Sequence, residues 1–333
     1  MLLNLSMSTS EHAQILALAL LVGWLIDRYF GEPIAAWHPV VWMGDYLNFC
    51  GKHCAPKAAH EVLELESSNT KRKMLAFFLG AFFWLLAAIV LVGIAWKLQQ
   101  ALGALAWYWQ GIILGFLLKP LFSWRMLRDE VLAVELALQD SLDAGRQQLA
   151  RLVSRDVRQL QAHEVRESAI ETLAENLNDS VISALFWFVL VGLPGVLLYR
   201  FANTADAMWG YRGERGGRVW TWAGKWAARA DDVLSWPGAR LTACMMYLSV
   251  ARMPTSQLWR EAGITTSPNG GWPMGAMALL LNIRLSKPGV YVLHAKGLEV
   301  DRQHIDLAVR LCERAICAWF LCVGVLLLLS AWY

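Results

Sequence analysis

Long apolar runs alternate along the chain with short polar clusters, and the longest runs have the length of membrane-spanning helices. The run from Met74 to Trp96 contains no charged residue, and a helix needs about 20 apolar residues to cross a bilayer. Comparable segments lie near residues 12–30, 105–122 and 315–333. The pattern predicts an all-α, polytopic integral membrane protein that folds as a single membrane domain over residues 1–333.

Polar segments separate these predicted spans and cover residues 27–73, 123–181 and 202–310. Between Met126 and Leu142, apolar residues recur at helical spacing among charged ones, which is typical of an amphipathic helix. Lys71, Arg72 and Lys73 directly precede the second span, and cations beside a span favour the cytoplasmic side. We therefore expect a multi-pass protein of the cell (inner) membrane whose polar regions, amphipathic helices and active face lie on the cytoplasmic side.

The apolar segment at residues 182–201 differs from the others because helix-breaking residues interrupt it. Gly192, Pro194 and Gly195 lie at its centre, and each half has only about ten residues, too few to cross a bilayer alone. A crossing would also place the polar clusters before and after the segment on opposite sides of the membrane. We therefore favour a re-entrant hairpin, which brings these clusters to one face and is tolerated where protein covers the broken backbone.

Composition agrees with a membrane location and argues against nucleic-acid binding. The chain is 57% hydrophobic and contains 18 tryptophans, more than a soluble domain usually has. Its net charge is only +3, and no basic run is interleaved with aromatic residues. We expect no nucleic-acid partner. The six cysteines include no CxxC pair, so they give no standard zinc motif.

Acidic residues are concentrated between the apolar segments, where an unpaired charge is costly. Glu171, Glu175 and Asp179 are spaced by four residues and are expected on one face of a helix, while Asp231 and Asp232 form an adjacent pair. Carboxylate oxygens are the ligands that Mg²⁺ prefers, and Mg²⁺ usually accompanies a nucleotide or a phosphate. The pattern therefore indicates a magnesium site, although three acids on an amphipathic helix also fit ordinary surface ion pairs.

Arginine and lysine side chains lie among these acids and suit anionic ligands. Arg155, Lys225, Arg229 and Arg240 are the candidates, because guanidinium groups bind phosphate or carboxylate through paired hydrogen bonds. The chain has no GxxxxGK[ST] phosphate loop, so any nucleotide must bind in a non-standard site. His38, in the loop after the first span, is by itself more typical of a structural hydrogen bond than of catalysis.

In their order along the chain, these motifs resemble the CobD/CbiB family, the membrane-associated adenosylcobinamide-phosphate synthases of cobalamin biosynthesis. The resemblance covers nearly the whole chain and includes Asp27 with Gly31-Glu32-Pro33, His38-Pro39-Val40, Ser154-Arg155-Asp156, Glu175-Asn176, Asp179, Asn203-Thr204, Asp206, Ala228-Arg229, Asp231-Asp232 and Arg240-Leu241-Thr242. Each motif is weak alone, but the ordered set is specific. Ser183-Ala184 and Ser235 depart from the family pattern, which usually has Ala-Pro and Asn there.

The resemblance implies an ATP-dependent ligase that joins a carboxylate of adenosylcobyric acid to aminopropanol or its phosphate, with magnesium. In such an enzyme Glu171, Glu175, Asp179, Asp231 and Asp232 hold the metal. The cofactor-binding residues are Ser154, Arg155, Asn176, Lys225, Arg229, Arg240 and His38. Asp156, Asn203 and Asp206 are the candidates for orienting or deprotonating the amine, with no choice among them. The lipid bilayer and other membrane enzymes of the corrinoid pathway are the expected partners, and the oligomeric state stays open.

Two other classes of protein remain as alternatives. A magnesium-dependent intramembrane prenyl- or phospho-alcohol transferase also uses aspartates at a membrane face, but Asp231-Asp232 lacks the third Asp of a DDxxD motif. A membrane transporter or sensor would carry ionisable groups within its spans. In this chain those groups are concentrated between the spans.

Overall fold

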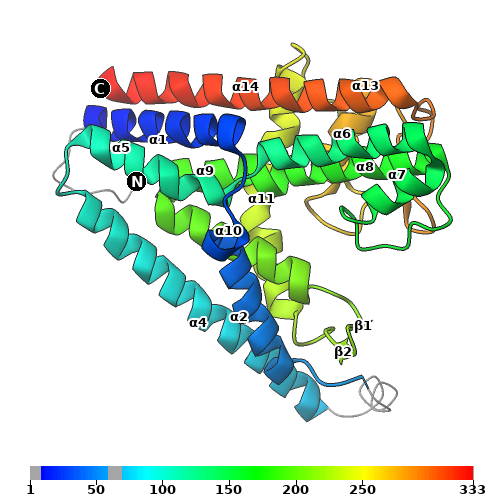
Figure 1. The fold of residues 1–333 in the computed structure, drawn as a ribbon, viewed down its shortest axis with the longest axis horizontal. Coiled ribbons are helices and arrows are strands. Elements are labelled where there is room, and N and C mark those ends of the chain that lie inside the picture. Colours follow the sequence, from blue (N-terminus) through cyan, green and yellow to red (C-terminus); the bar gives the residue numbers. More distant parts are fainter. Residues whose placement is uncertain (1–8, 59–69, 333) are drawn as a thin grey trace. The chain divides into compact units, whose positions relative to one another are not determined.

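The computed structural model of the protein describes residues 9–58 and 70–332. The helices are α1 (Thr9–Phe30), α2 (Pro39–Cys54), α4 (Thr70–Leu102), α5 (Trp107–Leu118), α6 (Trp124–Asp140), α7 (Leu142–Leu149), α8 (Ala162–Leu177), α9 (Ser183–Val191), α10 (Leu193–Trp209), α11 (Lys225–Leu248), α12 (Ser256–Ala262), α13 (Gly271–Leu281) and α14 (Arg302–Trp332), as Figure 1 shows. Residues 59–69 of the predicted polar region 27–73, and Tyr333 of the last predicted span, lie outside the described residues.

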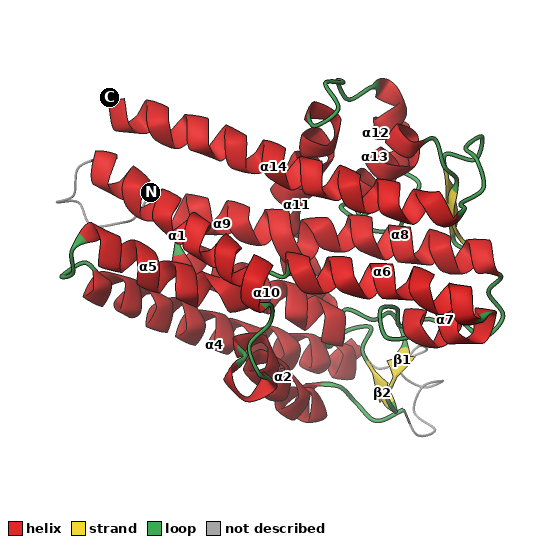
Figure 2. Ribbon diagram, turned by 45° about the horizontal axis from the view of Figure 1, so that its top comes forward, coloured by secondary structure: helices red, strands yellow, loops and turns green. Residues whose placement is uncertain are grey.

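Two short antiparallel hairpins are the strand structure within the described residues (Figure 2). In the first, β1 (Glu214–Arg215) pairs with β2 (Arg218–Val219). In the second, β3 (Leu285–Lys287) pairs with β4 (Tyr291–Leu293), with Ser286 opposite Val292. Apart from these hairpins, the all-α prediction is confirmed.

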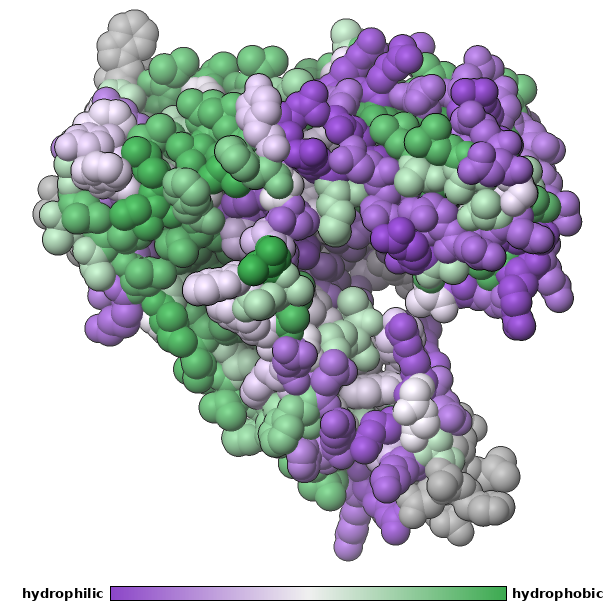
Figure 3. All heavy atoms as spheres, viewed as in Figure 1, coloured by the Kyte–Doolittle hydropathy of each residue, from purple (hydrophilic) through white to green (hydrophobic). Residues whose placement is uncertain are grey.

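Within the part of the chain that the structure describes, three helices, α1, α4 and α14, are long and apolar enough to cross a membrane. They coincide with the predicted spans at 12–30, 74–96 and 315–333. Hydrophobic residues cover much of the visible surface of α4 (Figure 3), and its exposed side chains include Phe78, Phe82 and Ile89. Exposed apolar surface of this kind suits contact with lipid.

The segment predicted to span at 105–122 is helical but short. Helix α5 has 12 residues and continues into the 3-10 helix Lys119–Leu121. At 1.5 Å per residue, α5 alone is about 18 Å long, against about 30 Å for the hydrocarbon core of a bilayer. A crossing by this segment therefore stays a prediction.

The chain breaks at Gly192, as the sequence predicted. Gly192 has φ of +78°, a conformation that is open to glycine but strained for most other residues. A Cβ atom on Gly195 would lie only 2.6 Å from the Trp187 carbonyl oxygen, so α10 turns back against α9 directly after the break. The reversal agrees with a hairpin, and its re-entry into a membrane stays a prediction.

The predicted amphipathic helix at 126–142 is α6, followed without a linker by α7. Its apolar positions Leu127, Val131 and Val134 are buried, which confirms the amphipathic pattern. Ser141 ends α6 because its side chain accepts a hydrogen bond from the Ala144 backbone N–H, at 3.0 Å, and so caps α7. The cytoplasmic location of these helices stays a prediction.

The chain forms two compact units, each assembled from separate segments. Unit 1 comprises Met1–Gly23, Pro33–Leu121 and Ala184–Ser235, and unit 2 comprises Trp24–Glu32, Phe122–Ser183 and Trp236–Tyr333. The single membrane domain stays a prediction, since two compact units can belong to one domain.

The core of unit 1 lies where α2, α4 and α10 pack together. The indoles of Trp209 and Trp220 stack there with ring centroids 6.0 Å apart, and the Trp209 indole N–H donates to the Leu47 carbonyl at 3.2 Å. This hydrogen bond satisfies the polar atom of a fully buried ring. Gly80 of α4 allows a closer contact, because a Cβ atom there would lie 2.0 Å from the Ala223 carbonyl oxygen.

Replacing Gly80 therefore gives a direct test of this packing. We expect Gly80→Ala to lower the free energy of unfolding by about 1–3 kcal/mol or more, because backbone must move to admit the methyl group. Gly93→Ala is the matched control on the same helix, since nothing lies within 4 Å of a Cβ atom at Gly93. Thermal unfolding of both variants in detergent measures the difference, and equal midpoints would contradict the packing described.

Candidate functional site

Helix α8 carries Glu171 and Glu175 of the candidate site together with Glu167, and residues of unit 2 contact them. Glu167 is completely buried. It accepts hydrogen bonds from the Ser286 backbone N–H, at 2.8 Å, and from the Ser286 hydroxyl, and it pairs with Arg284 at 3.4 Å. One helical turn later, Glu171 is 5% exposed. Burial of two carboxylates on successive turns requires positive or hydrogen-bonding partners for each.

Arg155 is the partner of Glu171. Its Nη2 atom lies 3.4 Å from Glu171 Oε2, and the same atom donates to the Ser168 hydroxyl. Two atoms of the pair are buried without a hydrogen-bond partner, namely Arg155 Nη1 and Glu171 Oε1. An unsatisfied donor beside an unsatisfied acceptor is costly in a buried site unless a ligand or water completes both.

Burial raises the pKa of Glu171 to about 7, because loss of solvent outweighs the opposing charge of Arg155 and the hydrogen bond with Tyr291. Glu175, one turn further on, retains an accessible side chain, yet enough protein surrounds its carboxylate that desolvation also raises its pKa, against the charge of Lys287. The Tyr291 hydroxyl interacts with this acidic pair, and its pKa is raised by burial and by the two carboxylates. Glu171 is therefore only partly ionised at neutral pH.

Asp179 lies beyond the end of α8, in the π-helix Asn178–Ile182. The side-chain NH₂ group of Asn178 donates to the Asp179 carboxylate at 2.7 Å. The side-chain oxygen of Asn178 accepts from the Ser183 hydroxyl at 2.7 Å and from the Thr242 hydroxyl at 3.4 Å. The regular α-helical face expected for the three acids therefore ends before Asp179. Short π-helical turns are frequent at functional sites.

Arg240 lies between two indoles in unit 2. Its guanidinium carbon is 4.6 Å from the Trp236 ring centroid and 4.8 Å from that of Trp272. The same group donates to the Asn269 side chain at 2.6 Å and to the Pro268 carbonyl at 2.9 Å, and desolvation lowers its pKa. The turn from Ser267 to Asn269 therefore holds this arginine in place.

Unit 1 contains a second acidic group, centred on Asp231. The Asp231 carboxylate accepts from the Ser235 hydroxyl at 3.1 Å and from the Asn203 amide at 3.4 Å. Its pKa is raised to about 7 by desolvation and then by the negative charge of Asp206, against those two hydrogen bonds. Asn203, Asp206 and Asp231, predicted from separate motifs, are therefore neighbours in the fold.

The other candidates in unit 1 have simpler surroundings. Asp232 pairs with Arg229 at 3.4 Å, and desolvation raises the pKa of Asp232. The Lys225 ammonium lies 4.2 Å from the Trp222 ring centroid. His38 caps α2, accepting the Val40 backbone N–H at Nδ1 over 3.3 Å, so the expected structural hydrogen bond is present.

The remaining candidates in unit 2 lie at its surface or within a helix. Asp156 is exposed and bound by Arg158 at 2.7 Å, and these hydrogen bonds lower its pKa to about 2. A carboxylate with so low a pKa is a weak proton acceptor. Ser154 is exposed in the same loop, and the Asn176 amide donates to the Thr172 carbonyl at 3.0 Å.

The metal candidates are divided between the units. Glu171, Glu175 and Asp179 belong to unit 2, and Asp231 and Asp232 belong to unit 1. Among the described residues, no three His, Cys, Asp or Glu side chains are placed as a metal site requires. The atoms best suited to a ligand are the unsatisfied pair, Glu171 Oε1 for a cation and Arg155 Nη1 for an anion.

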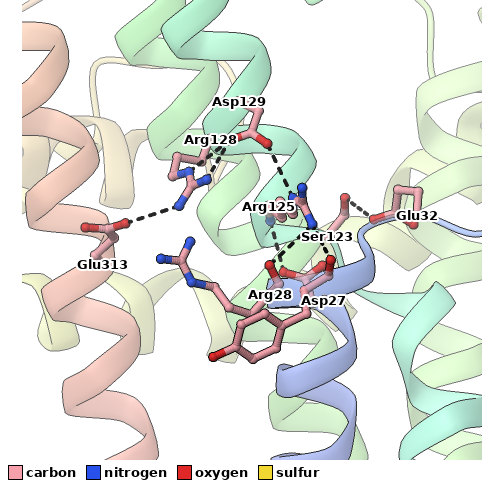
Figure 4. Close-up of polar contacts among 9 residues, drawn as sticks. Asp27, Arg28, Glu32, Ser123, Arg125, Arg128, Asp129 and Glu313 are labelled. Atoms are coloured by element: carbon pink, nitrogen blue, oxygen red, sulfur yellow. Dashed lines mark hydrogen bonds and ion pairs between the residues drawn. The ribbon is translucent and has the colours of Figure 1, made fainter.

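A group of hydrogen bonds around Asp27 holds the end of α1 in unit 2 (Figure 4). The buried Asp27 carboxylate accepts a hydrogen bond from the Arg125 backbone N–H at 3.0 Å. This bond satisfies one of the backbone N–H groups in the first turn of α6 that have no acceptor within the helix. Arg125 in turn donates to the Tyr29 carbonyl at 2.8 Å, and Ser123 donates to Glu32 at 2.6 Å. Gly31, with φ of +70°, ends α1 between these contacts. The motif Asp27 with Gly31-Glu32 therefore stabilises the connection between α1 and α6.

These observations define a helical protein whose described residues include three helices suited to crossing a membrane, one group with buried acids on α8 and one half-buried group of acids around Asp231, each with positive or hydrogen-bonding partners. The sequence profile described as CobD/Cbib protein matches residues 20–316. The chain belongs to the CobD/CbiB family, as its motifs suggested.

Curated relatives match along most of their length. "Probable cobalamin biosynthesis protein CobD" of Thermococcus kodakarensis is 33% identical over 90% of this chain and 92% of its own. "Cobalamin biosynthesis protein CobD" of Stutzerimonas stutzeri is 34% identical over 92% and 95%, and that of Dehalococcoides mccartyi is 32% identical over 93% and 97%. No solved structure matches the chain at a comparable level.

Sequence analysis missed several polar residues of these groups. Glu167 and Tyr291 contact the Glu171 region, and Asn178 links the π-helix to α11 within unit 2. Glu135 is buried on α6 and makes paired hydrogen bonds with Arg166 at 2.6 and 3.0 Å. The four-residue step from Glu167 to Glu171 and Glu175 was a usable signal for Glu167, whereas no spacing rule points to Tyr291.

The raised pKa of Glu171 predicts how stability depends on pH. Its pKa is about 7 in the folded protein and 4.5 in a model compound. Between these values the folded protein retains a proton that the unfolded chain has released, so the free energy of unfolding falls as pH rises from about 4.5 to about 7. Glu171→Gln should flatten this decline, because glutamine does not titrate.

Thermal unfolding of the full chain in detergent, measured from about pH 5 to about pH 8, tests this expectation. Glu214→Gln is the control, because it removes the carboxylate of an exposed residue, and it should keep the parent's slope. Parallel curves for the parent and Glu171→Gln would contradict the assignment.

Proposed function

We propose that the protein catalyses ATP-dependent amide formation in cobalamin biosynthesis, at the cytoplasmic face of the membrane. Its substrates would be adenosylcobyric acid and aminopropanol or its phosphate. Family membership and the names of the relatives support a role in this pathway. A carboxylate does not acylate an amine unaided, so the reaction needs an activated carboxyl group, for which an acyl phosphate is the chemically simplest form.

The unsatisfied pair on Arg155 and Glu171 is the observation that carries this proposal. Arg155 Nη1 is a buried cationic donor without a hydrogen-bond partner. A phosphate or carboxylate oxygen would accept a hydrogen bond from it. Ser168 and Glu171 hold the other nitrogen of the same guanidinium. The arginine is therefore fixed in orientation before any anion binds, which favours binding of a reacting phosphate or carboxylate.

The residues present fit a magnesium–nucleotide complex in their chemistry. Glu171, Glu175 and Asp179 would supply oxygen ligands in unit 2, and Asp231 and Asp232 would do so in unit 1. Bound magnesium would offset the negative charge of the phosphates. Within unit 2, Arg155 and Arg240 would contribute positive charge, and Ser154 and Asn176 would contact the nucleotide. Within unit 1, Arg229 and Lys225 would contribute positive charge, and His38 is the candidate for cofactor binding.

An amine must lose a proton before or while it attacks a carboxyl carbon. Asp206 and Asp231 form a coupled acidic pair in which the pKa of Asp231 is about 7, and Asn203 donates to it. Asp206 is the neighbour whose negative charge helps to raise that pKa, whereas the exposed Asp156 has a pKa of about 2 and is a weak proton acceptor. Among the three catalytic candidates, the surroundings therefore favour Asp206, with Asn203 as an orienting residue.

Product analysis of membranes or purified protein tests the reaction itself. Incubation with ATP, magnesium, adenosylcobyric acid and aminopropanol phosphate should yield the corresponding amide, detected by mass spectrometry. Omission of ATP or of magnesium should abolish the product. A folded preparation that forms no amide from either amino alcohol would count against the ligase proposal.

Arg155→Ala should reduce kcat/KM at least about 100-fold, since it removes the fixed cation at the reacting groups. Arg151→Gln is the matched control, because Arg151 lies four residues earlier with a side chain that is 64% exposed. It should retain turnover close to that of the parent. Similar losses in the two variants, at equal folded fractions, would remove Arg155 from the site.

Asp206→Asn should lower kcat by about 100-fold or more, the contribution typical of a general base. Asp140→Asn, which changes an exposed residue at the end of α6, should leave kcat unchanged. In the parent protein, kcat should rise with pH through about 7, where the acidic pair becomes able to accept a proton. A pH-independent kcat in the parent would argue against this assignment.

A further inference from the structure

A cavity of about 410 Å³ lies in unit 1 beside the start of α4, apart from the acidic groups described above. It is bounded by the end of α2, the segment that follows it, Arg218 of β2 and the first turns of α4. Four of its lining residues are cationic, namely Lys52, Lys57, Arg72 and Arg218, and its described lining contains no acidic residue. The cavity is therefore suited to an anion.

Arg218 is the most constrained of these cations. Its Nη1 atom donates to the backbone carbonyls of Lys52, at 3.0 Å, and of Ala55, at 2.6 Å. These contacts fix the guanidinium at a half-buried position, and they do not neutralise its charge. Within the described residues Arg218 makes no ion pair, and its Nε and Nη2 atoms make no hydrogen bond. A half-buried guanidinium held in this way favours an anionic ligand with paired oxygen acceptors.

The remaining wall of the cavity is apolar and belongs to a candidate membrane span. Leu75, Ala76 and Leu79 of α4 line it, and Leu75 is 59% exposed. From these residues α4 continues as the most hydropathic of the three candidate spans. The cations of the cavity thus lie beside the polar start of α4. The apolar lining residues lie further along α4, toward the part of the helix that would enter the bilayer.

We propose that this cavity binds the phosphate headgroup of an anionic phospholipid, with the acyl chains along α4. Basic pockets beside membrane helices attract anionic headgroups, and each cation near the membrane surface strengthens that attraction about fivefold. A free phosphate would satisfy the same arginine, but it would leave the exposed apolar wall uncovered. The inference does not depend on the proposed ligase activity.

The test uses the purified full chain in a neutral detergent, with phosphatidylglycerol, phosphatidylcholine and inorganic phosphate as separate probes. Phosphatidylglycerol should raise the unfolding temperature and remain bound in native mass spectrometry, while the other two probes should do neither. Equal retention of phosphatidylcholine would overturn the headgroup assignment. A full shift with inorganic phosphate alone would overturn the lipid assignment and identify a free-anion site.

Variants locate the effect. Arg218→Gln should weaken phosphatidylglycerol binding about fivefold or more, and Lys97→Gln, which removes an exposed cation near the other end of α4, should not change it. Because Arg218 also holds two backbone carbonyls, Lys57→Gln gives a second test on an exposed side chain that makes no such contact. Unchanged binding in Lys57→Gln and in any folded Arg218→Gln protein would overturn the proposal.

Discussion

The cost of removing a charge from water governs the polar interior of this protein. Helix α8 buries Glu167 and Glu171 on successive turns, and an isolated carboxylate in either place would be strongly destabilising. Glu167 is compensated in full by Arg284 and Ser286. Glu171 is compensated only in part, because Arg155 is shared with Ser168 and leaves one carboxylate oxygen without a partner. The two acids differ in this respect, and the incompletely paired one is the better candidate for ligand contact.

Much of the helical framework follows from the hydrophobic pattern. The charge-free run from Met74 to Trp96 indicates a long apolar helix whatever surrounds it, and Gly192 with Pro194 breaks a helix through local backbone geometry alone. Local rules also explain the end of α6, since Ser141 caps the next helix. The four-residue spacing does not show that the chain forms a π-helix at Asp179, because that irregularity depends on the tertiary contacts of Asn178 with Ser183 and Thr242.

The candidate site could be predicted in its residue types but not in its pairing. Acids and arginines between apolar segments indicate charge chemistry, and Glu171 and Arg155 were both recognised from that pattern. Their contact joins a loop to a helix 16 positions away, and a sequence gives no distance across such a separation. The sequence also does not show which candidate side chains are exposed to solvent. Asp156 and Asp206 look alike as motif residues, yet one is at the surface with Arg158 and the other lies beside Asp231.

Electrostatic coupling explains why a cation and an anion would bind together at Arg155 and Glu171. An anion at Arg155 Nη1 would weaken the stabilisation that this arginine gives to the Glu171 carboxylate and would raise the pKa of Glu171 further. A cation at Glu171 Oε1 would act in the opposite direction and favour the ionised acid. Each ligand therefore reduces the electrostatic penalty that the other imposes, and the resulting coupling must be reciprocal. A site built from one partly paired acid and one partly paired arginine thus favours a ligand that brings both charges, as a metal–phosphate complex does.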